Sequence, residues 1–367
     1  MLKKTVLLLL TSAFLGSSSL FAQTLTKEAT NAFALYNKTG DIKQLELARK
    51  KVDEGYKTYK DSITYKNNLL RSLVYSTLAY VDSNRKYSYP TDPINVAMFS
   101  FKKLNDRKLN NEYQEEITYI KKRLSQAYLS QARHALSYNN YPEAVNSFLH
   151  IDSLSSKNIT IYHDLAILYE RMGYNYKAIE FYQKVLQDRS RPEYYLALSN
   201  LYESVRQYQK AVEITQQGRA NFPDNKDLVF KELNYFSDAG NFQEVTKLIK
   251  NALRLDENNI NLNYLAGFSY EMTGKTQQAE EYYKKVLSLD PNNYDANYAL
   301  GLLYLNLYIQ ESKSDLINRA KQYLTKANEI DPNQIKTLQS LAILYRNTGE
   351  EIQLQRVNNK INQLKLN

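Results

Sequence analysis

The sequence predicts an all-α solenoid of antiparallel helix pairs, and three observations lead to that prediction. A pattern of apolar, small and helix-ending residues recurs about every 34 residues through the last two thirds of the chain. Glycine (10) and proline (7) are scarce among the 367 residues, which favours long helices over short strands joined by tight turns. Tyrosine (33) and phenylalanine (12) are abundant, so the chain carries the large side chains that a packed core needs and a disordered chain lacks.

Each repeat contains two apolar stripes with helical spacing. In the unit that begins at Pro192, positions 4, 7, 8 and 11 are Tyr195, Leu198, Ser199 and Tyr202, which lie on one face of a first helix. A second stripe occupies positions 20, 24, 27 and 28. Glycine at position 15 of several units and proline at position 32 are helix-ending signals. Small residues at positions 8 and 20 allow the two helices to approach closely. Because one pair cannot bury its apolar face alone, neighbouring pairs must stack.

This pattern resembles the tetratricopeptide repeat (TPR) family, whose consensus places the same residue classes at the same positions. The resemblance covers residues 125–367 and implies a right-handed TPR superhelix. It divides this region into seven tandem units: 125–158, 159–191, 192–225, 226–259, 260–293, 294–334 and 335–367.

Three of the units depart from the consensus. Leu233 and Val245 are larger than the residues usual at positions 8 and 20, so the helices of unit 226–259 are expected to splay. Unit 294–334 has seven extra residues near 309–315, which either lengthen its first helix or form a projecting loop. The last helix is polar, as a solenoid cap requires.

The region before the tandem units has two parts. Residues 1–22 combine a basic start, an apolar run and a small residue at the end, which is the pattern of a secretory signal peptide. They predict an exported, periplasmic bacterial protein with no stable membrane span after cleavage. Residues 23–124 are helical in pattern but irregular, and we interpret them as a divergent module of two TPR-like helix pairs.

Charge separates this module from the tandem units. Residues 23–124 contain 19 Lys/Arg and 12 Asp/Glu, whereas residues 125–367 contain 27 of each. The basic module could meet an acidic protein, an anionic membrane surface or a cell-wall polymer. Clusters such as Arg49-Lys50-Lys51 and Lys121-Lys122-Arg123 are also typical of solvated helix faces, which is the simpler interpretation. Export argues against nucleic acid as a partner.

The resemblance also implies where a partner binds, because the concave face of TPR proteins is built from first helices, chiefly at positions 2, 5, 9 and 12. Aromatic rings offer a large rigid contact area, and Asn amides both donate and accept hydrogen bonds. Such a groove suits an extended peptide or a helix of a partner. The alternative is that residues at position 5 pack against the next unit as core. The predicted groove residues are Leu196, Asn200, Phe230, Asn234, Tyr264, Phe268 and Tyr298.

The residue inventory argues against catalysis. The chain has no cysteine, and His134, His150 and His163 lack metal-ligand spacing with a third donor. No phosphate-binding glycine loop or nucleophile elbow occurs. We therefore expect no enzyme activity, no cofactor and no metal.

The resulting hypothesis is a protein-binding adaptor of the cell envelope that uses the concave groove, with proteins as partners. Two alternatives stay open: a structural subunit of an envelope secretion, motility or assembly complex that uses the convex face and termini, and a module that stacks cell-wall glycan on its aromatic rings. Self-association also stays open.

Overall fold

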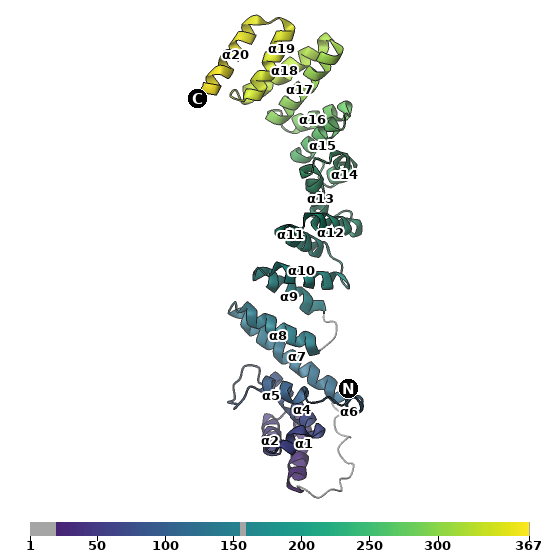
Figure 1. Cartoon of the computed structure of the whole chain (residues 1–367), viewed down its shortest axis with the longest axis vertical. Coiled ribbons are helices and arrows are strands. Elements are labelled where there is room, and N and C mark those ends of the chain that lie inside the picture. Colours follow the sequence, from purple (N-terminus) through teal and green to yellow (C-terminus); the bar gives the residue numbers. More distant parts are fainter. Residues whose placement is uncertain (1–19, 155–158, 367) are drawn as a thin grey trace. The chain divides into compact units, whose positions relative to one another are not determined.

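The structure is a computed structural model that describes residues 20–154 and 159–366. It divides into two compact units, Met1–Arg189 and Ser190–Asn367, which we describe separately. Every regular element within the described ranges is a helix (Figure 1). None of these helices is both long and apolar enough to cross a membrane. Of the predicted signal peptide, residues 1–19 lie outside the described ranges, and residues 20–22 begin the first helix.

Unit 1 begins with an irregular helical module and continues into regular antiparallel pairs. The pairs are α1 with α2, α4 with α5, α7 with α8 and α9 with α10. The helices are α1 (Leu20–Thr39), α2 (Ile42–Glu54), α3 (Tyr59–Ile63), α4 (Tyr65–Val81), α5 (Pro93–Phe101), α6 (Arg107–Glu112), α7 (Gln114–Ser137), α8 (Tyr141–Leu154), α9 (Ile159–Arg171) and α10 (Asn175–Leu186).

Unit 2 consists of five consecutive antiparallel pairs, and the second helix of each packs on the first helix of the next. The helices are α11 (Pro192–Ser204), α12 (Tyr208–Asn221), α13 (Lys226–Asp238), α14 (Phe242–Leu255), α15 (Ile260–Met272), α16 (Thr276–Leu289), α17 (Tyr294–Glu311), α18 (Ser314–Ile330), α19 (Ile335–Thr348) and α20 (Glu351–Leu366). The paired antiparallel helices of both units confirm the predicted fold class.

Small residues at position 8 bring the helices of a pair close together, as the pattern predicts. A Cβ added to Gly267 would lie 2.6 Å from the ring of Tyr283 on the partner helix. A Cβ added to Gly301 would lie 2.6 Å from Leu324. Tyr283 and Leu324 are fully buried, so neither has room to retreat.

Most turns within the tandem pairs share one backbone geometry. Position 15 has a positive φ at Gly173 (76°), Gly240 (67°) and Gly274 (74°), and also at Asn139 (56°) and Arg206 (60°). The following amide bonds back into the helix, as in Tyr174 N to Tyr169 O and Gln207 N to Tyr202 O, both 2.8 Å. This pattern ends helices without help from a side chain.

The predicted boundary between module and tandem units at 124/125 falls inside α7. This 24-residue helix is continuous. Its first half contacts α4, and its second half pairs with α8, where Tyr128 stacks on His150 at 4.7 Å. The compact units divide much later, at 189/190. Because the single helix α7 contacts both α4 and α8, no linker separates the N-terminal helices from the first tandem pair.

The structure also settles the departures in two repeats. The extra residues of unit 294–334 lengthen both helices, since α17 runs to Glu311 and α18 begins at Ser314. Ser312 makes the intervening turn with a φ of 56°. In unit 226–259, α13 and α14 share less contact than the other tandem pairs, in line with the larger Leu233 and Val245.

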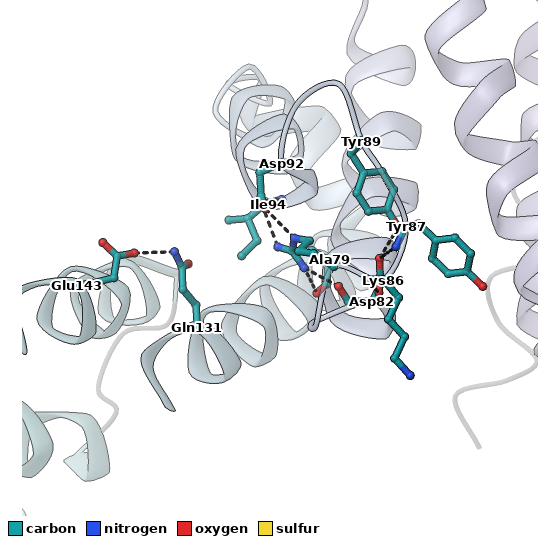
Figure 2. Close-up of polar contacts among 10 residues, drawn as sticks. Ala79, Asp82, Lys86, Tyr87, Tyr89, Asp92, Ile94, Gln131 and Glu143 are labelled. Atoms are coloured by element: carbon teal, nitrogen blue, oxygen red, sulfur yellow. Dashed lines mark hydrogen bonds and ion pairs between the residues drawn. The ribbon is translucent and has the colours of Figure 1, made fainter. Parts of the chain in front are cut away.

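A long loop between α4 and α5 is held by two charged side chains (Figure 2). The buried carboxylate of Asp82 accepts bonds from the amides of Lys86 (2.7 Å) and Tyr87 (3.1 Å) and from the hydroxyl of Tyr89 (3.0 Å). Arg85 bonds Asp92 through Nε (2.6 Å) and Nη2 (3.1 Å). Its Nη1 donates to the carbonyl of Asp82 (2.7 Å). The loop is therefore fixed to the end of α4.

Candidate partner-binding face

The predicted groove residues all lie on the first helices of unit 2. Leu196 and Asn200 are on α11, Phe230 and Asn234 on α13, Tyr264 and Phe268 on α15, and Tyr298 on α17. Within each helix the two positions are four residues apart, so their side chains share one face. The structure thus places the predicted set on one kind of surface, which we call the first-helix face.

The aromatic members of this face are neither free nor fully buried. Phe230, Tyr264, Phe268 and Tyr298 pack against the buried core of unit 2 and stay partly exposed. Burial raises the pKa of the Tyr264 hydroxyl to about 12. The alternative interpretation, in which position 5 contributes to the core, is therefore partly correct.

Particular ring contacts hold these aromatic side chains in place. Tyr264 lies 5.6 Å from the ring of Tyr283, and Phe268 meets Phe242 edge to face at 5.2 Å. Tyr298 is stacked on Tyr294 at 6.0 Å. The rings therefore present fixed edges, and a partner would not have to order them.

Cations from the same unit cover two of these rings. The Lys226 ammonium lies 5.2 Å from the centroid of Phe230. Lys336 on α19 lies 4.9 Å from the ring of Tyr298 on α17. The contact between Lys336 and Tyr298 joins neighbouring repeats, so part of the Tyr298 ring is already covered by a side chain of the same protein.

The two asparagines differ. Both side chains are exposed, but Asn200 Oδ1 accepts a bond from Lys231 Nζ at 2.7 Å. Asn234 makes no side-chain hydrogen bond to any described residue, so its donors and acceptor are available to a ligand. Of the two exposed asparagines, Asn234 is therefore the one with its side-chain hydrogen-bonding groups unoccupied.

The glutamates at position 12 are used mainly inside the protein. Glu203 accepts bonds from Lys231 Nζ (3.0 Å) and from the hydroxyl of Tyr235. Glu271 accepts a bond from the hydroxyl of Tyr283 at 2.7 Å. Burial raises the pKa of Glu271, and the Tyr283 bond partly offsets this. These carboxylates therefore brace the first-helix face.

Sequence reasoning missed one ion pair with a buried carboxylate beneath this face. Glu232 on α13 is 1% exposed and is paired with Arg219 on α12. Glu232 occupies position 7, where five of the other six units have Leu or Ala. An acid at that position was the signal that could have revealed the pair.

The histidines stay apart in the structure. His134 lies 5.0 Å from the ring of Tyr138, and His163 meets Tyr182 edge-on at 6.2 Å. Burial lowers the pKa of His150, which stacks on Tyr128. Across residues 20–154 and 159–366, no group of three or more His, Cys, Asp or Glu side chains could hold a metal ion.

Solved structures of several repeat proteins are similar to this chain. The C-terminal part of a TPR repeat-containing protein from Cytophaga hutchinsonii has 18% identity and a TM-score of 0.48, covering 64% of this chain and 93% of its own. YrrB, described as a TPR protein with an unusual peptide-binding site, has 22% identity and a TM-score of 0.42, covering 54% and 98%. The MamA protein has 20% identity and a TM-score of 0.36, covering 56% and 91%. No curated protein matches the chain.

The consecutive helix pairs define the chain as a helical-repeat protein. Tetratricopeptide repeat models match residues 159–187, 261–293 and 282–317, and these segments fall on pairs that the structure shows. No catalytic domain matches. The matched segments are similar to tetratricopeptide repeats and together cover less than a quarter of the chain.

Proposed function

We propose that this protein is an adaptor of the cell envelope that binds an extended segment or a helix of a partner protein on the first-helix face of unit 2. The observation that carries the proposal is the continuity of this face: α11, α13, α15 and α17 each present partly exposed apolar or amide side chains at positions 5 and 9. Rings held by fixed contacts offer area at low entropic cost, and Asn234 offers both a donor and an acceptor.

Export and a periplasmic location are part of the proposal. The support for them is the three-part pattern of residues 1–22. YrrB is described as having a peptide-binding site, and by analogy we extend peptide binding to this chain. The proposed partner is a protein, and the adaptor role needs no cofactor.

The test is an in-cell crosslinking pull-down of the tagged full chain and two matched variants. Asn234→Arg adds a cation to the first-helix face, and Gln217→Arg makes the same kind of change at an exposed site on α12. These substitutions are preferable to alanine at Phe230, Tyr264 or Tyr298, because those rings pack on the core.

We expect Asn234→Arg to reduce recovery of envelope partners at least tenfold, since burying an unpaired charge in an interface costs about 3 kcal/mol or more. Gln217→Arg should leave recovery unchanged. The reverse result would support the alternative, a structural subunit that uses its second helices and termini. Retention on cell-wall material in place of protein partners would support the glycan-binding alternative.

A further inference from the structure

A small apolar pocket lies among three helices of unit 1, away from the first-helix face. α4 packs against both α1 and α7, and the pocket has a volume of about 60 Å³. That volume exceeds the ~15 Å³ that one water needs and is well below the ~150 Å³ cavity that admits benzene, so it suits a short aliphatic side chain. The pocket lining includes Phe33 and Ala34 on α1, Leu69, Leu70 and Leu73 on α4, and Glu116 on α7.

Along the same helices, Arg123 is held between two tyrosine rings. Its guanidinium carbon lies 4.4 Å from the ring of Tyr80 on α4 and 5.0 Å from that of Tyr119 on α7. The Tyr119 hydroxyl is 3.2 Å from Thr77 Oγ1. Burial raises the pKa of Tyr36 on α1, and the charge of Arg123 partly offsets this.

Arg123 has donors to spare. None of the ion pairs between described residues includes it, and its side-chain bond to Gln126 Oε1 is long, at 3.4 Å. The site is accessible, since Tyr80 is 39% exposed. A guanidinium already oriented by two rings loses little freedom when it binds a carboxylate through two parallel bonds.

The pocket and Arg123 are in register along both helices. Leu73 and Tyr80 are seven residues apart on α4, and so are Glu116 and Arg123 on α7. Seven residues make about two helical turns, or about 10 Å, and put each pair on one face. An extended peptide covers this distance in about three residues. The loop network in Figure 2 fixes the end of α4 just after Tyr80.

We propose that α1, α4 and α7 form a second docking site, which binds an acidic peptide segment of a partner protein with an aliphatic side chain in the pocket and a carboxylate on Arg123 about three residues away. Charge complementarity argues for this occupant, because residues 23–124 carry 19 cations and 12 anions. Glu116 at the pocket disfavours the reverse orientation, in which the ligand carboxylate would lie beside it.

The test uses the full chain and defined peptides, with affinity measured by NMR titration. The probe is a capped peptide in which two serines separate a leucine from a glutamate. One comparison peptide has glutamine in place of glutamate, and another has serine in place of leucine. Wild type should bind the glutamate peptide about tenfold more tightly than the glutamine peptide, since a hydrogen bond to a charged group contributes about 1.5–3 kcal/mol.

Three variants separate the parts of the site. Arg123→Met should remove the preference for glutamate, whereas Lys121→Met, at an exposed cation on the same helix, should retain it. Ala34→Leu fills the pocket and should weaken the leucine peptide about fivefold while the preference for glutamate persists. Circular dichroism and the melting temperature check that each variant is folded.

Three results would overturn the proposal. One is equal affinity of wild type for the glutamate and glutamine peptides. Another is an equal loss of preference in Arg123→Met and Lys121→Met, which would mean that only net charge matters. The third is the absence of detectable binding at about 10 mM peptide, which would mean an affinity weaker than that of a millimolar complex. None of these results bears on the first-helix face.

Discussion

The turns of the tandem repeats and the loop between α4 and α5 end helices in different ways. In the repeats, backbone amides bond back into the helix after one residue with a positive φ, as at Gly173 and Gly274. In the loop, the carboxylate of Asp82 and the guanidinium of Arg85 make the corresponding bonds. Repeated geometry is therefore carried by the backbone, and geometry that occurs once is carried by particular side chains.

The packing of the helices shows the same difference. In unit 2, Gly267 and Gly301 let helices touch at fixed positions of the repeat. In the N-terminal module, Arg71 lies 4.4 Å from the ring of Tyr56 and 5.0 Å from that of Tyr75, and it bonds Asp53 at 2.8 Å. A module built this way depends on individual charged groups, whereas the stack depends on small residues.

The largest expected effect concerns the ion pair between Arg219 and Glu232. It is an exception to the comparison, because charged side chains here join two helices of unit 2. We expect Glu232→Ala to lower the free energy of unfolding by about 3–5 kcal/mol, because it leaves Arg219 without its buried partner. Urea denaturation of unit 2 measures the change.

The double substitution Arg219→Met/Glu232→Leu is the control. It should restore stability to near the wild-type value, because well-packed apolar residues often replace a buried ion pair without loss. A double variant as unstable as Glu232→Ala would contradict this account and would mean that the pair has no apolar equivalent.

A smaller effect is expected at the loop. Asp82→Ala removes the acceptor of three hydrogen bonds and should cost about 2 kcal/mol, since a hydrogen bond to a charged group contributes about 1.5–3 kcal/mol and water can replace the carboxylate at the exposed Lys86 and Tyr87. Hydrogen exchange at residues 83–91 should accelerate, while exchange in unit 2 stays constant. Asp82→Asn keeps one acceptor oxygen, so its stability and its loop exchange rate should lie between those of wild type and Asp82→Ala. Unchanged exchange in the loop would show that the backbone holds it, as in the repeats.

The smallest effect is a gain in stability. Arg206 adopts a φ of 60° at the position where four of the other six repeats have glycine. A side chain in this region costs about 1–2 kcal/mol, and glycine returns about half of that through its freedom in the unfolded chain. We therefore expect Arg206→Gly to stabilise the protein by about 0.5–1 kcal/mol, measured by thermal unfolding. Gly173→Ala should have the opposite effect, and a loss of stability in both variants would argue against a shared turn geometry.

The comparison explains how far the sequence could predict the fold. The phase of the small residues and of glycine at position 15 was enough to place seven helix pairs, because backbone geometry repeats with it. The short helices α3 and α6 carry no such phase and were missed. The predicted 124/125 boundary falls inside α7 because the repeat pattern begins partway along this helix.

The candidate site was predictable to a similar extent. Helical spacing correctly places Phe230 and Asn234 on one face, but it cannot show that Lys231 reaches Asn200 from the next repeat. In the run Lys121-Lys122-Arg123, the two lysines are solvated as expected. Arg123 instead stacks between rings, one of them from α4. Contacts between separate helices depend on rotamers that periodicity does not specify.

The continuity of α7 has a mechanical consequence for unit 1. Twenty-four residues at 1.5 Å each make a rod of about 36 Å, with Arg123 near its middle and the contact with α8 beyond it. A helix without an internal proline or glycine does not bend sharply, so its two halves turn together. Any tilt imposed on α7 at Arg123 is therefore passed on as a tilt of the first tandem pair.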